Sequence, residues 1–281
     1  MTEIGTQTPD GSHSAGTAPR PVRIFQFSDL HLYADPDGRL LGQNTRQTFE
    51  SVVRLAQSHA WPPDALVLTG DLIHDQQAEG YHYLRCRLEQ LGVPFFCLPG
   101  NHDRVDLLAG YTDSGAISGF RVEPIGIWDL ALLDSTIPFN EGGHLETMVL
   151  ADLDQYALVH PRRNLLIFLH HHPEPVGSRW IDSMQVDNGS DLMSLVAAHP
   201  NIFGVVCGHV HQAHEAHLGE RNWMSTPSTC IQFLPYSESF ALDQLTPGYR
   251  WFELYPDGRI KTAVRRTHTY PDPLLPSVGG Y

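Results

Sequence analysis

Five short apolar segments end directly in Asp, Asn or His, and this recurrence constrains the fold more than any other feature of the sequence. An apolar run followed by a polar side chain is typical of a buried strand whose chain turns outward at its carboxyl end. Because the carboxyl ends of parallel strands meet at one edge of a sheet, polar residues placed there converge on one site. The five strand ends are Asp29-Leu30-His31, Gly70-Asp71, Gly100-Asn101-His102-Asp103, His170-His171-His172 and Gly208-His209-Val210-His211.

The segments between these strand ends have the apolar period of amphipathic helices. Apolar residues recur at helical spacing from 49 to 56, behind an N-cap at Asn44 or Thr45, and again from 81 to 91. After Gly208 the sequence predicts a meander of strands at 214–218, 222–225, 251–255 and 260–264, with a turn at 255–258. Earlier strands are expected at 23–27, 65–69, 95–98, 127–133, 165–169 and 203–207. Strands interleaved with helices indicate an α/β fold.

The charge balance excludes whole classes of partner. The 281 residues include 18 Lys and Arg against 32 Asp and Glu, a formal charge of −14. No broad cationic face is therefore available, and we expect neither a nucleic acid nor a membrane as partner. The sequence is also rich in His, with 17 residues. Because His is the commonest metal ligand and the usual proton-transfer group near neutral pH, the His-rich strand ends indicate a metal site.

The remaining composition predicts one domain behind a tail. Residues 1–20 are rich in Thr, Gly, Ser and Pro, which predicts a disordered N-terminal tail. Residues 21–281 show neither a repeat nor a linker, so we expect a single domain. No secretion signal and no apolar stretch long enough for a bilayer is found, and the protein is expected to be cytoplasmic. Four widely spaced cysteines are expected to be free thiols: Cys86, Cys97, Cys207 and Cys230.

The strand-end side chains supply only nitrogen and oxygen ligands. Taken singly, Asp-x-His is more often a cap or turn former, Gly-Asp is typical of an Asx turn, and a lone His is more often a structural residue. Gly-Asn-His-Asp is harder to explain in this way, and the recurrence of such motifs at five strand ends favours a metal site. Seven ligands are too many for one tetrahedral zinc and suit two cations about 3.5 Å apart that share a carboxylate. Such a pair serves phosphoester hydrolysis, with a nearby imidazole protonating the departing alkoxide. The seven residues are Asp29, His31, Asp71, Asn101, His170, His209 and His211.

Two of the motifs carry local expectations. Extended backbone alternates its side chains, so His209 and His211 are expected on one side of an extended segment. In Gly100-Asn101-His102-Asp103 we expect the His102 ring to face the same cleft, with Asp103 available to hold it.

This ordered series resembles the metallophosphoesterase, or calcineurin-like, superfamily. The pattern of that superfamily is Asp-x-His, Gly-Asp, Gly-Asn-His-Asp/Glu, a strand-end His and Gly-His-x-His, and the resemblance covers residues 22–265. It implies a four-layer αββα sandwich of two mixed β-sheets flanked by helices. It also implies that Asp29, His31 and His211 hold one metal ion, that Asn101, His170 and His209 hold a second, and that Asp71 bridges the two.

The resemblance further implies which residues act on a substrate. His102 would be the general acid or a contact to the substrate phosphate, and Asp71 and Asn101 would share in catalysis. The resemblance leaves open which of His170, His171 and His172 coordinates a metal ion. We choose His170 because it directly follows the predicted strand. Iron or manganese is expected first, and zinc or cobalt would also suit these ligands. The implied substrate contacts are His31, Asn101, His102, His170 and His211.

Segments outside the ligands narrow the resemblance to a subfamily. Those at 40–45, 170–173 with Trp180, 226–233 and 247–250 look like the bacterial class III cyclic-AMP phosphodiesterases. Their implied reaction is hydrolysis of 3',5'-cyclic AMP, a small-molecule cyclic nucleotide, to 5'-AMP by in-line attack of a metal-bridging hydroxide. The alternatives are a broader phosphodiesterase, acting on 2',3'-cyclic nucleotides or glycerophosphodiesters, and a non-catalytic scaffold of the same fold. Both a monomer and a homodimer stay open.

Overall fold

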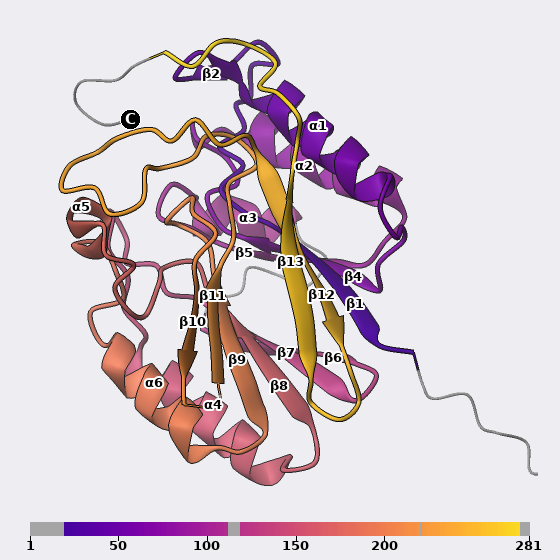
Figure 1. Ribbon diagram of the computed structural model, residues 1–281, viewed down its shortest axis with the longest axis vertical. Coiled ribbons are helices and arrows are strands. Elements are labelled where there is room, and N and C mark those ends of the chain that lie inside the picture. Colours follow the sequence, from indigo (N-terminus) through magenta and orange to yellow (C-terminus); the bar gives the residue numbers. More distant parts are fainter. Residues whose placement is uncertain (1–19, 112–118, 220, 276–281) are drawn as a thin grey trace, which may run out of the picture.

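Two mixed β-sheets lie face to face at the centre of the computed structural model, which describes residues 20–111, 119–219 and 221–275 (Figure 1). The first sheet has the order β13 (Ile260–Arg266), β12 (Gly248–Leu254), β1 (Val22–Phe27), β4 (Ala65–Thr69) and β5 (Phe95–Leu98). The second has the order β10 (Glu215–Leu218), β11 (Arg221–Ser225), β9 (Ile202–Cys207), β8 (Asn164–Phe168), β7 (Trp128–Leu133) and β6 (Phe120–Ile125).

The strands that carry the predicted motifs are parallel within each sheet. Strand β4 pairs in parallel with β1 and β5, and β8 pairs in parallel with β7 and β9. Antiparallel strands complete the sheets: β12 beside β1, β13 beside β12, β6 beside β7, and β10 beside β11, which itself pairs in parallel with β9. The carboxyl ends of β1, β4, β5, β8 and β9 can therefore meet at one edge of the sandwich.

Helices cover the outer face of each sheet, which gives four layers (Figure 1). Helices α1 (Thr45–Gln57), α2 (Ala78–Leu91) and α3 (Val105–Tyr111) cover the first sheet. Helices α4 (Thr147–Val159) and α6 (Gly189–Ala198) cover the second, and the short α5 (Arg179–Asp182) precedes α6. The Asn44 side chain caps α1 by accepting a hydrogen bond from the Gln47 N–H at 3.0 Å, as the sequence allowed. The two-residue strands β2 (Arg39–Leu40) and β3 (Gln43–Asn44) form a small ribbon before α1.

Three apolar clusters fill the spaces between adjacent layers. Strand side chains alternate between two faces, so Phe25 and Phe27 pack under the helices whereas Ile24 lies between the sheets. The cluster between the sheets also contains Phe168 and Phe252. The predicted αββα sandwich is thereby confirmed.

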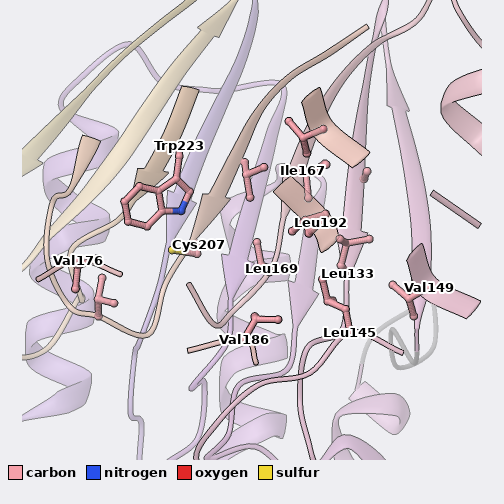
Figure 2. Close-up of a cluster of buried hydrophobic side chains, with 14 of the residues drawn as sticks. Leu133, Leu145, Val149, Ile167, Leu169, Val176, Val186, Leu192, Cys207 and Trp223 are labelled. Carbon is pink, nitrogen blue, oxygen red and sulfur yellow. The ribbon is translucent and has the colours of Figure 1, made fainter. Parts of the chain in front are cut away.

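The third cluster lies between the second sheet and its helices. Figure 2 shows Leu133, Ile167 and Cys207, from three neighbouring strands, in one cluster with Val149 of α4 and Leu192 of α6. All five side chains are buried. This close packing fixes the positions of β7, β8 and β9. It therefore also fixes the backbone from which the residues after β8 and β9 extend.

The predicted meander after Gly208 is wrong. Strands β10 and β11 form a hairpin in the second sheet, but β12 and β13 form a hairpin in the first. The chain between Ser225 and Gly248 crosses from one sheet to the other, and β12 then pairs with β1. The turn at 255–258 is present, with the Gly258 N–H donating to the Tyr255 carbonyl at 3.0 Å.

The predicted tail falls almost entirely outside the described residues. Of residues 1–20 only Arg20 is described, and its guanidinium pairs with Asp64 at 2.6 Å. Among the helices of the described residues, none has the length and apolar character of a membrane span. The four cysteines are free thiols, and three of them are buried.

Candidate metal centre

Backbone hydrogen bonds join the loops that follow β1 and β4. The Asp29 N–H donates to the Gly70 carbonyl at 3.0 Å, and the His31 N–H donates to the Asp71 carbonyl at 2.8 Å. Asp29, His31 and Asp71 all have positive φ angles, between 46° and 52°. Such left-handed backbone is uncommon outside glycine and concentrates at functional sites, where it aims side chains that a regular strand could not.

Four fully buried side chains form a first ligand group. Nε2 of His31 lies 3.2 Å from Nε2 of His211 and 3.7 Å from Oδ2 of Asp71. Nε2 of His211 lies 3.5 Å from Oδ1 of Asp29. The ligand atoms of this group, Asp29, His31, Asp71 and His211, all lie within 4.8 Å of one another and could hold a metal ion.

A second ligand group lies on the other side of Asp71. Nε2 of His170 is 3.0 Å from Oδ1 of Asn101 and 3.4 Å from Oδ1 of Asp71. The ring of His209 lies with its centroid 5.0 Å from that of His170. Asp71 therefore presents one carboxylate oxygen to each group, which is the arrangement expected of a bridging ligand.

The orientation of the His rings fits metal binding. Nδ1 of His170 contacts the Thr69 carbonyl at 2.7 Å, and Nδ1 of His211 contacts the Ile231 carbonyl at 2.9 Å. A carbonyl only accepts hydrogen bonds, so both rings carry their proton on Nδ1 and direct Nε2 into the site. Nε2 of His209 is buried and has no hydrogen-bond partner among the described residues. A cation would satisfy this nitrogen, and the donor set therefore fits the implied metal ions.

Three consecutive histidines follow β8, and their rings point to different partners. His171 contacts the Ser135 hydroxyl through Nδ1 at 2.9 Å and the Glu141 carbonyl through Nε2 at 3.2 Å. Nε2 of His172 lies 3.3 Å from Oδ1 of Asp182. Only His170 among the three faces both Asn101 and Asp71, although His171 also lies close enough to His170 and His209 to join a ligand group.

Burial sets the protonation of the site. Burial lowers the pKa of His31 and of His209 well below the ordinary value and that of His211 to about 3, so these rings are neutral. Burial acts to raise the pKa of Asp71, but His170 and His102 hold it well below its ordinary value. In His170, burial acts to lower the pKa, but Asp71 raises it to about 9. His31, His209 and His211 are therefore neutral beside an ionised Asp71, which is the form in which these side chains bind metal, whereas His170 would have to release a proton when a metal ion binds.

The Gly-Asn-His-Asp segment differs from the sequence expectation in one respect. Asp103 was expected to hold the His102 ring, but its carboxylate accepts hydrogen bonds from the N–H groups of Leu72, Ile73 and Gly100 and from the Tyr81 hydroxyl. It thereby fixes the loop that carries Asp71. The His102 N–H donates to Oδ1 of Asp71 at 3.0 Å, and the His102 ring packs on that of His31 at a centroid distance of 5.0 Å.

The sequence predicts an extended Gly-His-x-His segment, but the structure shows that it is not extended. His209 and His211 have φ angles of 65° and 49°, and the Val210 N–H donates to the Gly208 carbonyl at 2.7 Å. The reason is that β9 ends at Cys207, so that the motif forms a tight turn. The turn directs His211 to the first group and His209 to the second.

Comparison with known proteins identifies the family. The calcineurin-like phosphoesterase family matches residues 22–213. The chain belongs to this family. The 3',5'-cyclic adenosine monophosphate phosphodiesterase CpdA of Escherichia coli K12 is 35% identical over 255 residues, 89% of this chain and 93% of that protein. The 3',5'-cyclic-nucleotide phosphodiesterase alr5338 of Nostoc is 33% identical over 258 residues, 92% of this chain and 97% of that protein.

Solved structures share the fold of this calcineurin-like phosphoesterase at low sequence identity. A dimetal phosphatase from Danio rerio has a TM-score of 0.66 at 15% identity and covers 92% of this chain and 100% of its own. The purple acid phosphatase PPD1 from yellow lupin has a TM-score of 0.67 at 13% identity and covers 92% of this chain and 53% of its own.

Two features of this calcineurin-like phosphoesterase were missed in the sequence. The first is His74, whose Nδ1 lies 3.2 Å from Nδ1 of His31. Its place three residues after Asp71 was the signal available. The second is the role of the segment at 226–233, which packs behind the first ligand group. There the Ser228 hydroxyl donates to the Asp29 carbonyl at 2.6 Å, and the Phe233 ring stacks on His211 with centroids 4.0 Å apart.

Proposed function

We propose that the protein hydrolyses 3',5'-cyclic AMP to 5'-AMP at a dinuclear metal centre. The observation that carries the proposal is the pair of ligand groups joined by Asp71, with one carboxylate oxygen facing His31 at 3.7 Å and the other facing His170 at 3.4 Å. Metallophosphoesterase relatives named as cyclic-AMP phosphodiesterases, such as CpdA of Escherichia coli, support the choice of substrate.

Under this proposal each ligand group holds one metal ion. Asp29, His31 and His211 would hold the first, Asn101, His170 and His209 would hold the second, and Asp71 would serve both. When bound, the two ions lower the pKa of water at the site and neutralise the charge of the phosphoryl oxygens. Iron or manganese is proposed, because imidazole and oxygen ligands without thiolate suit both.

The side chains of the protein account for the proton and for the orientation of the substrate. The water loses one proton to solvent as its oxygen adds to phosphorus, the bond between phosphorus and O3' breaks, and a side chain gives a proton to the departing O3', which yields 5'-AMP; the side chain then takes up a proton from solvent. We assign His102 as the donor of that proton, because it is partly exposed and packs against His31 at the edge of the first group. The amide NH2 of Asn101 and the ring of His102 would contact the phosphate directly, whereas His31, His170 and His211, which use Nε2 to hold the metal ions, would orient it only through those ions.

A substrate comparison tests the proposal. The manganese-loaded protein is given 3',5'-cyclic AMP, 2',3'-cyclic AMP, glycerophosphocholine and an aryl phosphodiester at equal concentration. We expect the highest kcat/KM with 3',5'-cyclic AMP and 5'-AMP as the product. Faster turnover of the other diesters would favour the broader phosphodiesterase, and no turnover of any of them by protein with bound metal would favour a scaffold.

We also propose a cytoplasmic location and a small-molecule partner. The free thiols of Cys86, Cys97, Cys207 and Cys230 support a reducing compartment. Cell fractionation tests the location, and sedimentation of the purified protein distinguishes a monomer from the homodimer that the sequence left open.

A further inference from the structure

His74 lies beside the first ligand group and has no role in the proposed reaction. It lies on the segment that follows β4, and its N–H donates to the Leu32 carbonyl at 2.8 Å. Its Nδ1 lies 3.2 Å from Nδ1 of His31. The contact therefore uses Nδ1 of His31, whereas the other ring nitrogen, Nε2, points to His211.

The partner of Nδ1 distinguishes His31 from two other ligand histidines. Backbone carbonyls accept from Nδ1 of His170 and of His211, at 2.7 Å and 2.9 Å. A carbonyl can only accept, so those two rings are fixed in one tautomer. His31 instead contacts a side chain that can donate or accept, and its tautomer therefore depends on His74.

We propose that His74 is a positioning residue whose Nδ1 accepts the Nδ1–H of His31 and so directs Nε2 of His31 to the first metal ion. The inference rests on the proposed metal pair. When Nε2 of His31 binds a metal, its ring proton must lie on Nδ1, and Nδ1 of His74, 3.2 Å away, is placed to receive it with its lone pair. His74 then carries its own proton on Nε2.

The surroundings of His74 keep its ring in place for this role. The ring stacks on that of His102 with centroids 5.0 Å apart and planes inclined by 22°, and the Tyr33 ring packs on it at a centroid distance of 5.0 Å. The preceding backbone is held by Asp103, which accepts from the N–H groups of Leu72 and Ile73. A ligand-orienting side chain needs such a fixed position.

The same three rings offer a competing arrangement. One ring nitrogen each from His31, His74 and His102 lie within 4.8 Å of one another, so they could hold a cation of their own. That would make His74 a ligand rather than an acceptor, and it predicts an additional bound ion. The experiment must therefore count metal ions as well as measure their affinity.

Calorimetric titration of the metal-free protein with Mn²⁺ tests the inference. We expect two ions in the wild type and a loss of about 10- to 100-fold in affinity at one site in His74→Leu. In His74→Gln the amide oxygen can accept the same hydrogen bond, so most of the affinity should return. His160→Ala, at the end of α4, is the control and should bind as the wild type does.

The outcomes separate this inference from the proposed function. Two ions bound with unchanged affinity in His74→Leu would overturn the role of His74 and leave the metal pair intact. Three ions in the wild type and two in His74→Leu would make His74 a ligand. A wild type that binds no Mn²⁺ would overturn the metal pair and the inference with it.

A second measurement covers the case in which His74→Leu does not fold. In ¹H–¹⁵N spectra of the wild-type protein loaded with diamagnetic Zn²⁺, we expect the ring proton of His31 on Nδ1 and that of His74 on Nε2. A proton on Nδ1 of His74 would contradict the proposal, because that nitrogen could not then accept from His31.

Discussion

Asp71 is the residue on which the two ligand groups depend. It is almost completely buried, its two oxygens face His31 and His170, and one of them also accepts from the His102 N–H. Gly100 makes this position possible, because a Cβ atom there would lie 2.2 Å from Oδ1 of Asp71. The carboxylate therefore lies next to both groups at once, and its charge is the feature that an isosteric amide would lack.

We expect Asp71→Asn to lower kcat/KM for cyclic AMP by about 100-fold or more, because the amide cannot supply a charged oxygen to each of two metal ions. The amide keeps the size of the side chain, so the far-ultraviolet circular dichroism should be unchanged. Steady-state kinetics with saturating Mn²⁺ measures the effect. A rate within a factor of a few of the wild type would rule Asp71 out as the bridge.

Asp103 has a structural role that can be separated from catalysis. Its partly buried carboxylate accepts hydrogen bonds from three backbone N–H groups and the Tyr81 hydroxyl. Asp103→Ala should lower the free energy of unfolding by about 3 kcal/mol, because these donors lose their acceptor. Urea denaturation measures this loss. Asp106→Ala, which removes an exposed ion pair with Arg104, is the control and should leave the midpoint unchanged. Equal midpoints for both variants would contradict the assignment.

At the scale of elements, the predicted strand ends were accurate because burial marks them in the sequence. Strands β4 and β9 are nearly continuous runs of buried apolar residues, and Asp71 and His209 follow within two residues of each. The edge strand β6 was missed, because Phe120–Ile125 contains Glu123 and Pro124 and is only partly buried. A sequence signal for strands depends on burial, and edge strands have little of it.

The conformations of the loops could not be predicted from the sequence. Asp29 and His31 adopt positive φ angles where their N–H groups donate to a loop distant in the sequence, at the Gly70 and Asp71 carbonyls. The contact between His74 and His31 likewise depends on tertiary packing and has no signal in the local sequence. The motifs predicted which side chains gather at the edge, but the orientation of each ring required the structure.

The loop after β9 offers a test at this scale. A Cβ atom on Gly208 would lie 2.0 Å from the Ser28 hydroxyl and 3.0 Å from Oδ2 of Asp29. Gly208→Ala should therefore displace the His209 turn and weaken Mn²⁺ binding by about 10-fold or more. Gly110→Ala, where the added Cβ atom meets nothing within 4 Å, is the control and should bind Mn²⁺ normally. Normal binding by Gly208→Ala in calorimetry would show that this close approach does not position the ligands.

At the scale of the whole molecule, the two sheets bring together residues that are far apart in the sequence, such as His31 and His211, which are 180 positions apart. The ordered motifs predicted the sandwich, but not which sheet the last hairpin joins, because pairing of β12 with β1 depends on a long crossing segment. The formal charge of −14 does not oppose an anionic substrate, since two divalent cations at the site would reverse the local sign.

The most direct test of the metal pair is a titration of the metal-free protein with Mn²⁺ during which the release of 5'-AMP from cyclic AMP is measured. With protein well above the dissociation constants, the rate should rise to its maximum at two equivalents of Mn²⁺ per chain. A maximum at one equivalent, or no release of 5'-AMP at any concentration of Mn²⁺, would contradict a dinuclear cyclic-AMP phosphodiesterase.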